Sequence, residues 1–205
     1  MITADTLTGT LKSKLYSKSS FKYGLSDNQK KHMQSFTPEI LFEDNHLIIV
    51  NKPAGLLSQG DHSKTPSLLD LLKTFIKTRD KKPGNVFLGL VHRLDKPVSG
   101  AIIFAKTSKG ASRISREIRA KRLKKFYLAY TTPPPSAHEL YNRHLHTARF
   151  IRKDHKTVIE PVSSQGKEGS IRKNTLHLNK SSALHLIQLI SGRKHQIRAQ
   201  LAHLK

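Results

Sequence analysis

From residue 40 onward, apolar and polar residues alternate in blocks that predict short strands and helices. The apolar residues of 40–42 and 47–50 flank the polar residues 43–45, which predicts two strands joined by a tight turn. Residues 65–76 follow helical spacing, and Thr65 is placed to cap that helix. The apolar face of this helix comprises Leu68, Leu69, Leu72, Phe75 and Ile76. We expect this face to pack into a core.

The rest of the chain continues the same mixture of elements. Apolar runs predict strands at residues 86–91, 101–105, 126–130 and 183–190. Helices are expected from Thr107 or Ser108 to Leu123 and again after Gly192. The last helix has an apolar face made of Ile197, Leu201 and Leu204. Residues 136–182 are polar and basic and show no pattern that predicts an element. Hairpins and intervening helices predict an α+β fold, with a mixed, largely antiparallel sheet and flanking helices.

The first residues differ from the rest of the chain. They are rich in Ser, Thr and Lys, so we expect a basic arm over residues 1–37 and one domain over residues 38–205. No apolar run is long enough to cross a bilayer, and the start of the chain lacks the features of a secretory signal. We therefore expect a soluble, cytoplasmic protein. The absence of cysteine excludes disulfides, thiolate catalysis and cysteine-ligated metal sites.

The balance of charge indicates a polyanionic partner. Lys and Arg total 37 against 14 Asp and Glu, which gives a net charge of +23. Such a surface attracts nucleic acid through its phosphates, although a generally cationic surface is the simpler alternative. We favour nucleic acid because the positive charge is spread along the whole chain. The charge alone separates neither RNA from DNA nor an enzyme from a passive binder.

A polar loop between two predicted strands carries the first candidate functional residue. Residues 92–100 form this loop, and loops at strand ends are where rigid scaffolds present functional groups. Asp95 has Arg93 two residues before it and Lys96 directly after it. Such cations keep a carboxylate ionised, as a nucleophile or a base requires. From composition alone, however, an ordinary turn aspartate explains the residue better.

The start of the last predicted helix carries the second candidate group. Arg193 and Arg198 are available there for phosphates or carboxylates, and a helix start offers free N–H groups to an anion. His195 lies between them, with no second ligand at a metal-binding spacing. A solvated basic helix end is the simpler alternative.

The third candidate segment combines aromatic and basic side chains. Residues 124–129 place Phe126 and Tyr127 directly after two lysines. Flat rings beside cations are how proteins stack and hold unpaired bases. Alone, the segment is better explained as a strand with one buried tyrosine.

These segments in order are far more specific than any one of them. The motifs HRLDKPVSG, AIIFAK, KKFYLAY and SGRKHQIRAQLAHL follow ILFEDNHLIIVNKPAGLL, and this series resembles the RluA family of RNA pseudouridine synthases in order and spacing. The resemblance runs from about Ile40 to Leu204 and is weakest across residues 136–182. It implies a catalytic domain that isomerises uridine to pseudouridine at a specific site in tRNA or rRNA.

The resemblance also implies roles for individual residues. Asp95 matches the essential aspartate, which either adds to the sugar or removes a ribose proton, and the sequence leaves both routes open. Arg198 matches the arginine that pairs with that aspartate. Tyr127 matches the tyrosine that stacks on the target uracil, and Ile197 is expected on the opposite side of the ring.

RNA contacts are implied for a further set of residues. The target uridine is expected to flip out of its stack, and Arg93 is expected to enter the RNA in its place. The other residues expected to contact RNA are His92, Lys52, Arg193 and His195. A basic helix adds candidate phosphate contacts at Arg113, Arg116, Arg119, Lys121 and Arg122.

The implied isomerisation adds no atom and changes no redox state. We therefore expect no cofactor and no metal, and we expect a monomer.

Family members normally continue past the point that matches Lys205, so we expect this chain to lack a C-terminal strand of the family's sheet. No S4-like module precedes Ile40, which favours the shorter members of the family.

The alternative to a pseudouridine synthase is a non-catalytic RNA-binding protein derived from a synthase. A glycosidase with two carboxylates fits less well, because the three segments contain one acid.

Overall fold

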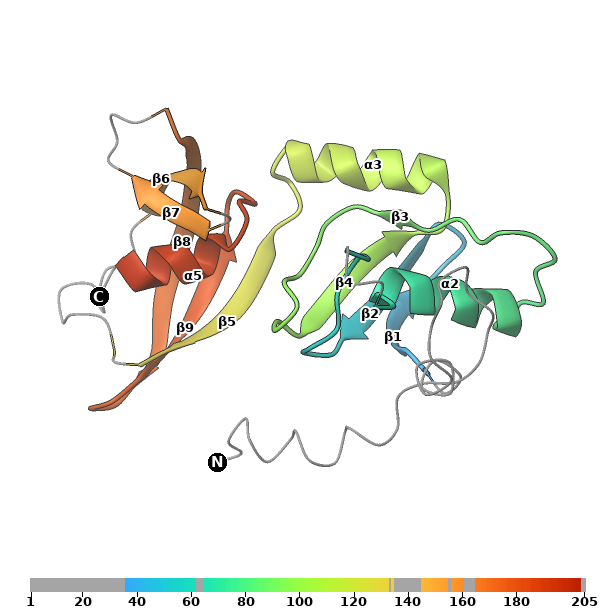
Figure 1. The fold of residues 1–205 in the computed structure, drawn as a ribbon, viewed down its shortest axis with the longest axis horizontal. Helices are drawn as coiled ribbons and strands as arrows, with labels where there is room; N and C mark the ends of the chain where they lie inside the picture. Colours follow the sequence, from blue (N-terminus) through green and yellow to red (C-terminus); the bar gives the residue numbers. More distant parts are fainter. Residues whose placement is uncertain are drawn as a thin grey trace. The chain divides into compact units, whose positions relative to one another are not determined.

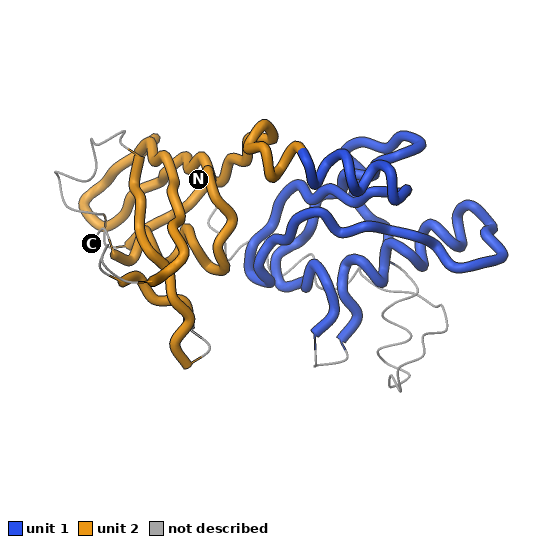
Figure 2. Tube along the Cα trace, turned by 90° about the horizontal axis from the view of Figure 1, so that it is seen from above, with its two compact units in different colours: residues 1–116 blue, residues 117–205 orange. Residues whose placement is uncertain are grey.

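The computed structural model divides the chain into two compact units, residues 1–116 and residues 117–205 (Figure 2). The structure describes residues 36–61, 65–132, 134, 145–154, 156–160 and 165–203. The arm expected over residues 1–37 lies almost entirely outside these residues. The single domain expected over residues 38–205 stays a prediction. Each unit contains a sheet, with four strands in the first and five in the second (Figure 1).

The sheet of the first unit is antiparallel. Its strands β1 (Glu39–Glu43), β2 (Leu47–Lys52), β3 (Gly89–Leu90) and β4 (Gly100–Ala105) lie in the order β1-β2-β4-β3. The Asp44 carboxylate closes the first turn by accepting hydrogen bonds from the backbone N–H groups of His46 and Leu47, at 2.7 and 2.6 Å. The hairpin predicted from residues 40–50 is therefore confirmed.

Alternation along β2 and β4 produces the core of this unit. Ile48 pairs with Phe104 and Val50 with Ile102, and all four side chains are fully buried. Side chains on alternate residues of a strand share one face, so both pairs lie on the same side of the sheet. Helix α2 (Leu68–Arg79) adds Leu68, Leu71, Leu72 and Ile76 to the buried apolar residues.

Helix α2 begins two residues later than the sequence predicted. Its N-cap is Ser67, which forms a capping box with Asp70, so Thr65 does not cap the helix. The hydroxyl group of Ser67 and the backbone N–H of Asp70 are 3.4 Å apart, and the Asp70 carboxylate accepts from the backbone N–H of Ser67 at 3.0 Å. Both residue types suit this motif, and the apolar stripe by itself did not distinguish the two caps.

Helix α3 (Ser108–Arg119) packs closely on the first sheet because small residues lie at the contact. A Cβ atom on Gly89 of β3 would lie 3.0 Å from the Cβ of Ala111, and one on Gly110 would lie 3.0 Å from the carbonyl oxygen of His46. The predicted strand over 86–91 is reduced to the two residues of β3, and Phe87 is 52% exposed. The run is apolar, but only Gly89 and Leu90 pair with β4.

The sheet of the second unit has the order β5-β9-β8-β6-β7, with every pairing antiparallel. Its strands are β5 (Lys125–Thr131), β6 (Leu145–Lys153), β7 (Lys156–Glu160), β8 (Lys167–Leu178) and β9 (Ala183–Leu189). The predicted strands at 126–130 and 183–190 are confirmed. Residues 136–182, for which the sequence predicted no element, contain β6, β7 and β8. The prediction missed these strands because long strands with polar residues on one face lack the apolar runs that signal a strand.

Helix α5 (Gln196–His203) covers one face of the second sheet (Figure 1). Leu201 of the helix forms a core with Ile171 of β8 and Ile187 of β9, and Ile197 packs against that core. The predicted helical face is therefore confirmed for Ile197 and Leu201, whereas Leu204 lies outside the described residues. Together the two sheets and their helices confirm the α+β class, and all strand pairings among the described residues are antiparallel.

Among the residues that the structure describes, no helix has both the length and the apolar composition needed to cross a membrane.

Candidate active site

Asp95 lies in the loop that connects β3 to β4, as the sequence predicted. Its backbone carbonyl accepts a hydrogen bond from the N–H of Val98 at 3.0 Å, so the residue begins a tight turn. The loop ends at Gly100, whose φ of 131° is accessible to glycine and strained for other residues. Asp95 is half-buried, whereas Arg93 and Lys96 on either side are exposed.

Residues 52–58, which comprise the last residue of β2 and the segment after it, hold the Asp95 loop on both sides of the aspartate. Before it, the Ser58 hydroxyl donates to the carbonyl oxygen of Leu94 at 2.7 Å and accepts from the N–H of Leu94 at 3.1 Å. After it, the carbonyl oxygen of Lys96 accepts from the N–H of Gly55 at 2.8 Å. We call this set of contacts the loop clamp. It fixes the backbone at the two neighbours of Asp95 and so restricts where its carboxylate can point.

Lys52 belongs to the loop clamp and is fully buried. Its ammonium group donates to the carbonyl oxygens of Pro53, Leu56 and Lys96, at 2.9, 2.7 and 3.3 Å. Burial lowers the pKa of Lys52 to about 8, and the negative charge of Asp95 partly opposes that shift. The expected contact between Lys52 and an RNA phosphate stays a prediction; in this structure the side chain is enclosed and its ammonium group is hydrogen-bonded within the fold.

His92 and Arg93 precede the clamped part of the loop. The Nε2 atom of His92 accepts a hydrogen bond from the N–H of Ile103 in β4 at 3.0 Å. That atom is engaged in the fold, so the expected RNA contact of His92 cannot be made through it. Arg93 is exposed and remains a predicted RNA contact.

In the second unit, the structure brings Tyr127 and Ile197 to the same apolar cluster. Tyr127 on β5 and Ile197 on α5 both pack against the buried residues Ile171, Ile187 and Leu201. Both side chains are only partly buried. They come from segments 70 residues apart in the chain, and only the packing of α5 on the sheet joins them.

A buried amide network fixes the turn that leads into α5. The Gln196 side-chain oxygen accepts from the Ser191 hydroxyl at 3.0 Å and from the N–H of Arg193 at 2.9 Å. Its nitrogen donates to the carbonyl oxygen of Ser170 and to the side-chain oxygen of Gln200, both at 3.1 Å. The network ties the turn and the helix to β8, and both glutamines are 2% exposed.

Three candidate residues lie in or beside this turn. Arg193 precedes the helix and does not open it as expected, and its Nε donates to the carbonyl oxygen of Glu168 at 2.8 Å. His195 has a φ of 54°, an uncommon conformation for histidine. Arg198 is exposed on α5. Arg198 belongs to the second unit and Asp95 to the first, so their pairing stays a prediction.

Sequence reasoning missed two of the structural supports of this region. Ser58 lies in a short loop with no pattern, and Gln200 looks like an ordinary polar residue of a helix. Burial distinguishes both: Ser58 is 4% exposed and Gln200 2% exposed. A buried polar side chain must be hydrogen-bonded, but no local sequence signal shows that burial.

Comparison with known proteins identifies the family. The family model described as RNA pseudouridylate synthase matches residues 46–203. A ribosomal large subunit pseudouridine synthase D of Nitrosomonas europaea is 30% identical, over 98% of this chain and 57% of its own length. A ribosomal large subunit pseudouridine synthase C of Buchnera aphidicola is 31% identical, over 82% of this chain and 51% of its own length.

A solved structure agrees with these sequence matches. The human RNA pseudouridylate synthase domain containing 4 has a TM-score of 0.65 and 26% identity, and the match covers 80% of this chain and 63% of that one. The chain belongs to the RNA pseudouridylate synthase family, which confirms the resemblance drawn from its motifs. It spans about half the length of the sequence relatives it matches.

Proposed function

We propose that this chain isomerises uridine to pseudouridine in a structured tRNA or rRNA, with Asp95 as the catalytic carboxylate. The observation that carries the proposal is the loop clamp, which holds both neighbours of Asp95 in a chain of this family. A group that reacts with substrate must be held in one geometry, and a hydrogen-bonded loop supplies this. The net charge of +23 supports an RNA substrate.

The reaction breaks the bond between ribose C1′ and uracil N1, turns the base, and forms a bond between C1′ and C5. A proton leaves C5 and N1 takes one up, so the product contains the same atoms as the substrate. Asp95 acts either by adding to C1′ or by removing a ribose proton to give a glycal. An ionised carboxylate serves both routes.

The finer assignments belong to the same proposal and are supported by the motif match. Arg198 pairs with the carboxylate of Asp95 and orients it. Tyr127 stacks on the target uracil, and Ile197 contacts the other side of the ring. The shared cluster of Tyr127 and Ile197 is consistent with these two roles. The uridine leaves its stack to react, and Arg93 occupies the space it vacates.

The test measures release of tritium from uracil C5 in ribosomal RNA and in tRNA. We expect the wild-type protein to release tritium from one of these RNAs, and Asp95→Asn to abolish the release while leaving the fold intact. Asp95→Asn keeps the side chain's shape and removes its charge. Release at the wild-type rate by this variant would refute the role of Asp95.

Asp154→Asn is the matched control. Asp154 is exposed in the turn between β6 and β7, with a φ of 46° that asparagine adopts readily, so this variant should release tritium normally. Wild-type protein that binds RNA but never releases tritium from any cellular RNA would instead favour the non-catalytic alternative.

A further inference from the structure

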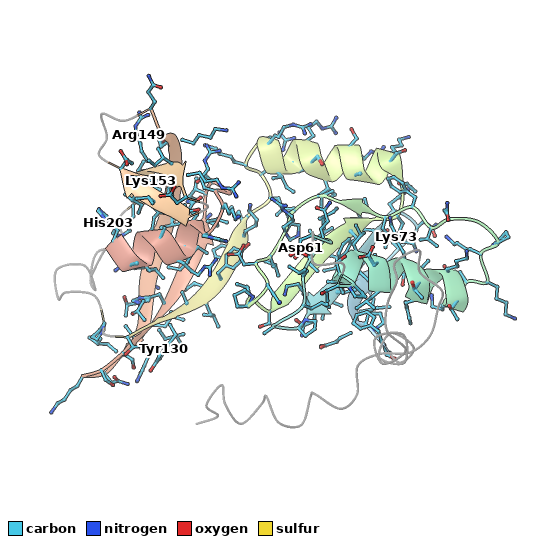
Figure 3. All side chains as sticks on the ribbon, viewed as in Figure 1. Asp61, Lys73, Tyr130, Arg149, Lys153 and His203 are labelled. Carbon is cyan, nitrogen blue, oxygen red and sulfur yellow. The ribbon has the colours of Figure 1, made fainter. Side chains whose placement is uncertain are left out.

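Helix α3 has an outer side that consists of cations and small residues. Lys109, Arg113, Arg116 and Arg119 are all exposed, and we call these four residues the basic face of α3. At 100° per residue they fall within about 120° of the helix circumference. Figure 3 shows nitrogen-tipped side chains along this helix on the side away from the first sheet. The basic face is therefore a continuous cationic strip.

The opposite side of α3 is occupied by the fold. Gly110 and Ala111 make the close approaches to His46 and Gly89, and Ile114 and Ile118 are half-buried. An amphipathic basic helix can also bind a membrane surface, but this requires its apolar side to enter the lipid. The inner side of α3 packs on the protein, so a partner meets only the outer side, which carries the basic face.

The acid of this helix, Glu117, binds a cation outside the basic face. Glu117 binds Arg122 through two hydrogen bonds of 2.6 and 2.7 Å, so Arg122 is already paired with an acid, and its expected contact with a phosphate stays a prediction. Lys121 has a φ of 56° in the turn that ends the helix. Within the described part of the chain, Lys109, Arg113 and Arg119 form no ion pair.

We propose that the basic face of α3 binds the sugar–phosphate backbone of the RNA that carries the target uridine. This inference rests on the proposed function. Residues three or four apart on a helix lie about 5–6 Å from one another, and the strip extends over about 15 Å, so it can contact several successive phosphates. It has no aromatic side chain to stack on bases, so it contributes affinity and orientation without reading sequence.

The experiment compares the RNA affinity of two variants over a range of salt concentrations. The test variant carries Lys109→Gln, Arg113→Gln and Arg119→Gln, because glutamine keeps helix propensity and removes charge. The matched control removes the same charge from α2 and the loop that follows it, by Lys73→Gln, Lys77→Gln and Lys82→Gln. Both are made in the Asp95→Asn background, so that binding is measured without chemistry. The probe is a fluorescent RNA hairpin with uridines in its loop.

Each lost phosphate contact should lower the slope of log Kd against log salt by about 0.7–0.9. We expect the α3 variant to lose about 2 units of slope and at least tenfold in affinity at low salt, with the control changed much less. Equal slopes for the α3 variant and its parent would overturn the inference. The inference would also be overturned if the α3 variant kept the RNA slope of its parent but lost binding to phosphatidylserine vesicles, because the cations would then bind a membrane surface and not RNA.

The two proposals fail separately. A wild-type protein that releases no tritium from RNA contradicts the proposed function, whereas the inference about α3 is decided by the salt slopes alone. Each variant should unfold on heating at the same temperature as its parent. This control shows that a change in the salt slope does not come from loss of the fold.

Discussion

The hydroxyl group of Ser58 forms two hydrogen bonds with the backbone of Leu94, the residue immediately before Asp95. Ser58 and Leu94 are 36 residues apart in the chain, and both are buried. The carbonyl oxygen of Lys96, immediately after Asp95, is held by Gly55 and Lys52. Asp95, the proposed catalytic residue, therefore lies between two residues, Leu94 and Lys96, whose backbone is held by the segment of residues 52–58.

We expect Ser58→Ala to loosen the loop on the N-terminal side of Asp95. Both hydrogen bonds to Leu94 are lost, and two buried backbone groups lose their partner, which should lower the free energy of unfolding by about 1–2 kcal/mol. Because the loop positions the proposed nucleophile or base, kcat for pseudouridine formation should fall about tenfold with little change in KM. Ser99→Ala is the control, since Ser99 is exposed in the same loop. A change in KM alone would argue against a positioning role.

Lys52→Met should test the buried ammonium group of the loop clamp. The variant removes the ammonium donor from the carbonyl oxygens of Pro53 and Leu56, while that of Lys96 keeps the N–H of Gly55. We expect the free energy of unfolding to fall by about 2–4 kcal/mol. Denaturant unfolding measures this. Lys96→Met removes an exposed ammonium group from the neighbouring loop and should cost much less. Equal stability of the two variants would show that the Lys52 contacts contribute little.

The same residue predicts a pH dependence in alkaline solution. Burial lowers the pKa of Lys52 from 10.5 to about 8. Between these values the unfolded chain holds a proton that the folded chain has released, so this group makes stability rise with pH from about 8 to 10.5. The rise should be absent from Lys52→Met when wild type and variant are compared by denaturant unfolding at each pH.

Glu43 should contribute stability that is lost in acid. Its carboxylate lies 2.7 Å from both Arg79 and Lys106, and hydrogen bonds from Arg79 are the largest cause of the lowering of its pKa from 4.5 to about 2. A lowered folded-state pKa means that the contribution is complete above 4.5 and disappears as pH falls toward 2. Because the pair is partly exposed, we expect Glu43→Gln to cost about 1–2 kcal/mol at neutral pH.

Unfolding of Glu43→Gln and wild type at several pH values measures this difference, which should shrink toward pH 2 and in high salt. Glu160→Gln is the control, because Glu160 forms no ion pair among the described residues. A difference that is constant from neutral pH to acid would contradict the assignment.

His185 should make the second unit sensitive to mild acid. Its ring nitrogens lie 3.0 Å from the Thr131 hydroxyl and 3.1 Å from the Thr175 hydroxyl, and the side chain is fully buried. Burial, with a smaller effect of the Lys173 charge, lowers the pKa of His185 below 6.5. As pH falls through 6.5 the unfolded chain takes up a proton that the folded chain does not, so stability decreases.

His185→Gln should remove this part of the acid sensitivity, as measured by thermal unfolding between neutral and weakly acidic pH. His177→Gln should retain it, because His177 is exposed on β8. If both variants respond to acid like wild type, the effect does not come from His185.

Much of the fold could be predicted from local pattern. The first hairpin, β4, β5, β9 and the apolar face of α5 follow apolar runs or helical spacing that local geometry produces directly. The failures have a common cause. Residues 145–178 form three strands whose buried residues are interspersed with charged ones, and β3 is short because only two residues of its apolar run find a partner. Pairing between distant segments decided both cases.

For the site, the sequence by itself determined the family, the placement of Asp95 in a loop between two strands, and the large excess of positive charge. These follow from residue types in short segments, which do not depend on the rest of the chain. Only the tertiary structure decided that Lys52 is a buried support of the loop and that Ser58 holds Leu94. Only it decided that Tyr127 and Ile197 share one cluster. The physical reason is that burial and hydrogen bonding depend on which remote segments of the chain come into contact. The local sequence around a residue does not determine those contacts.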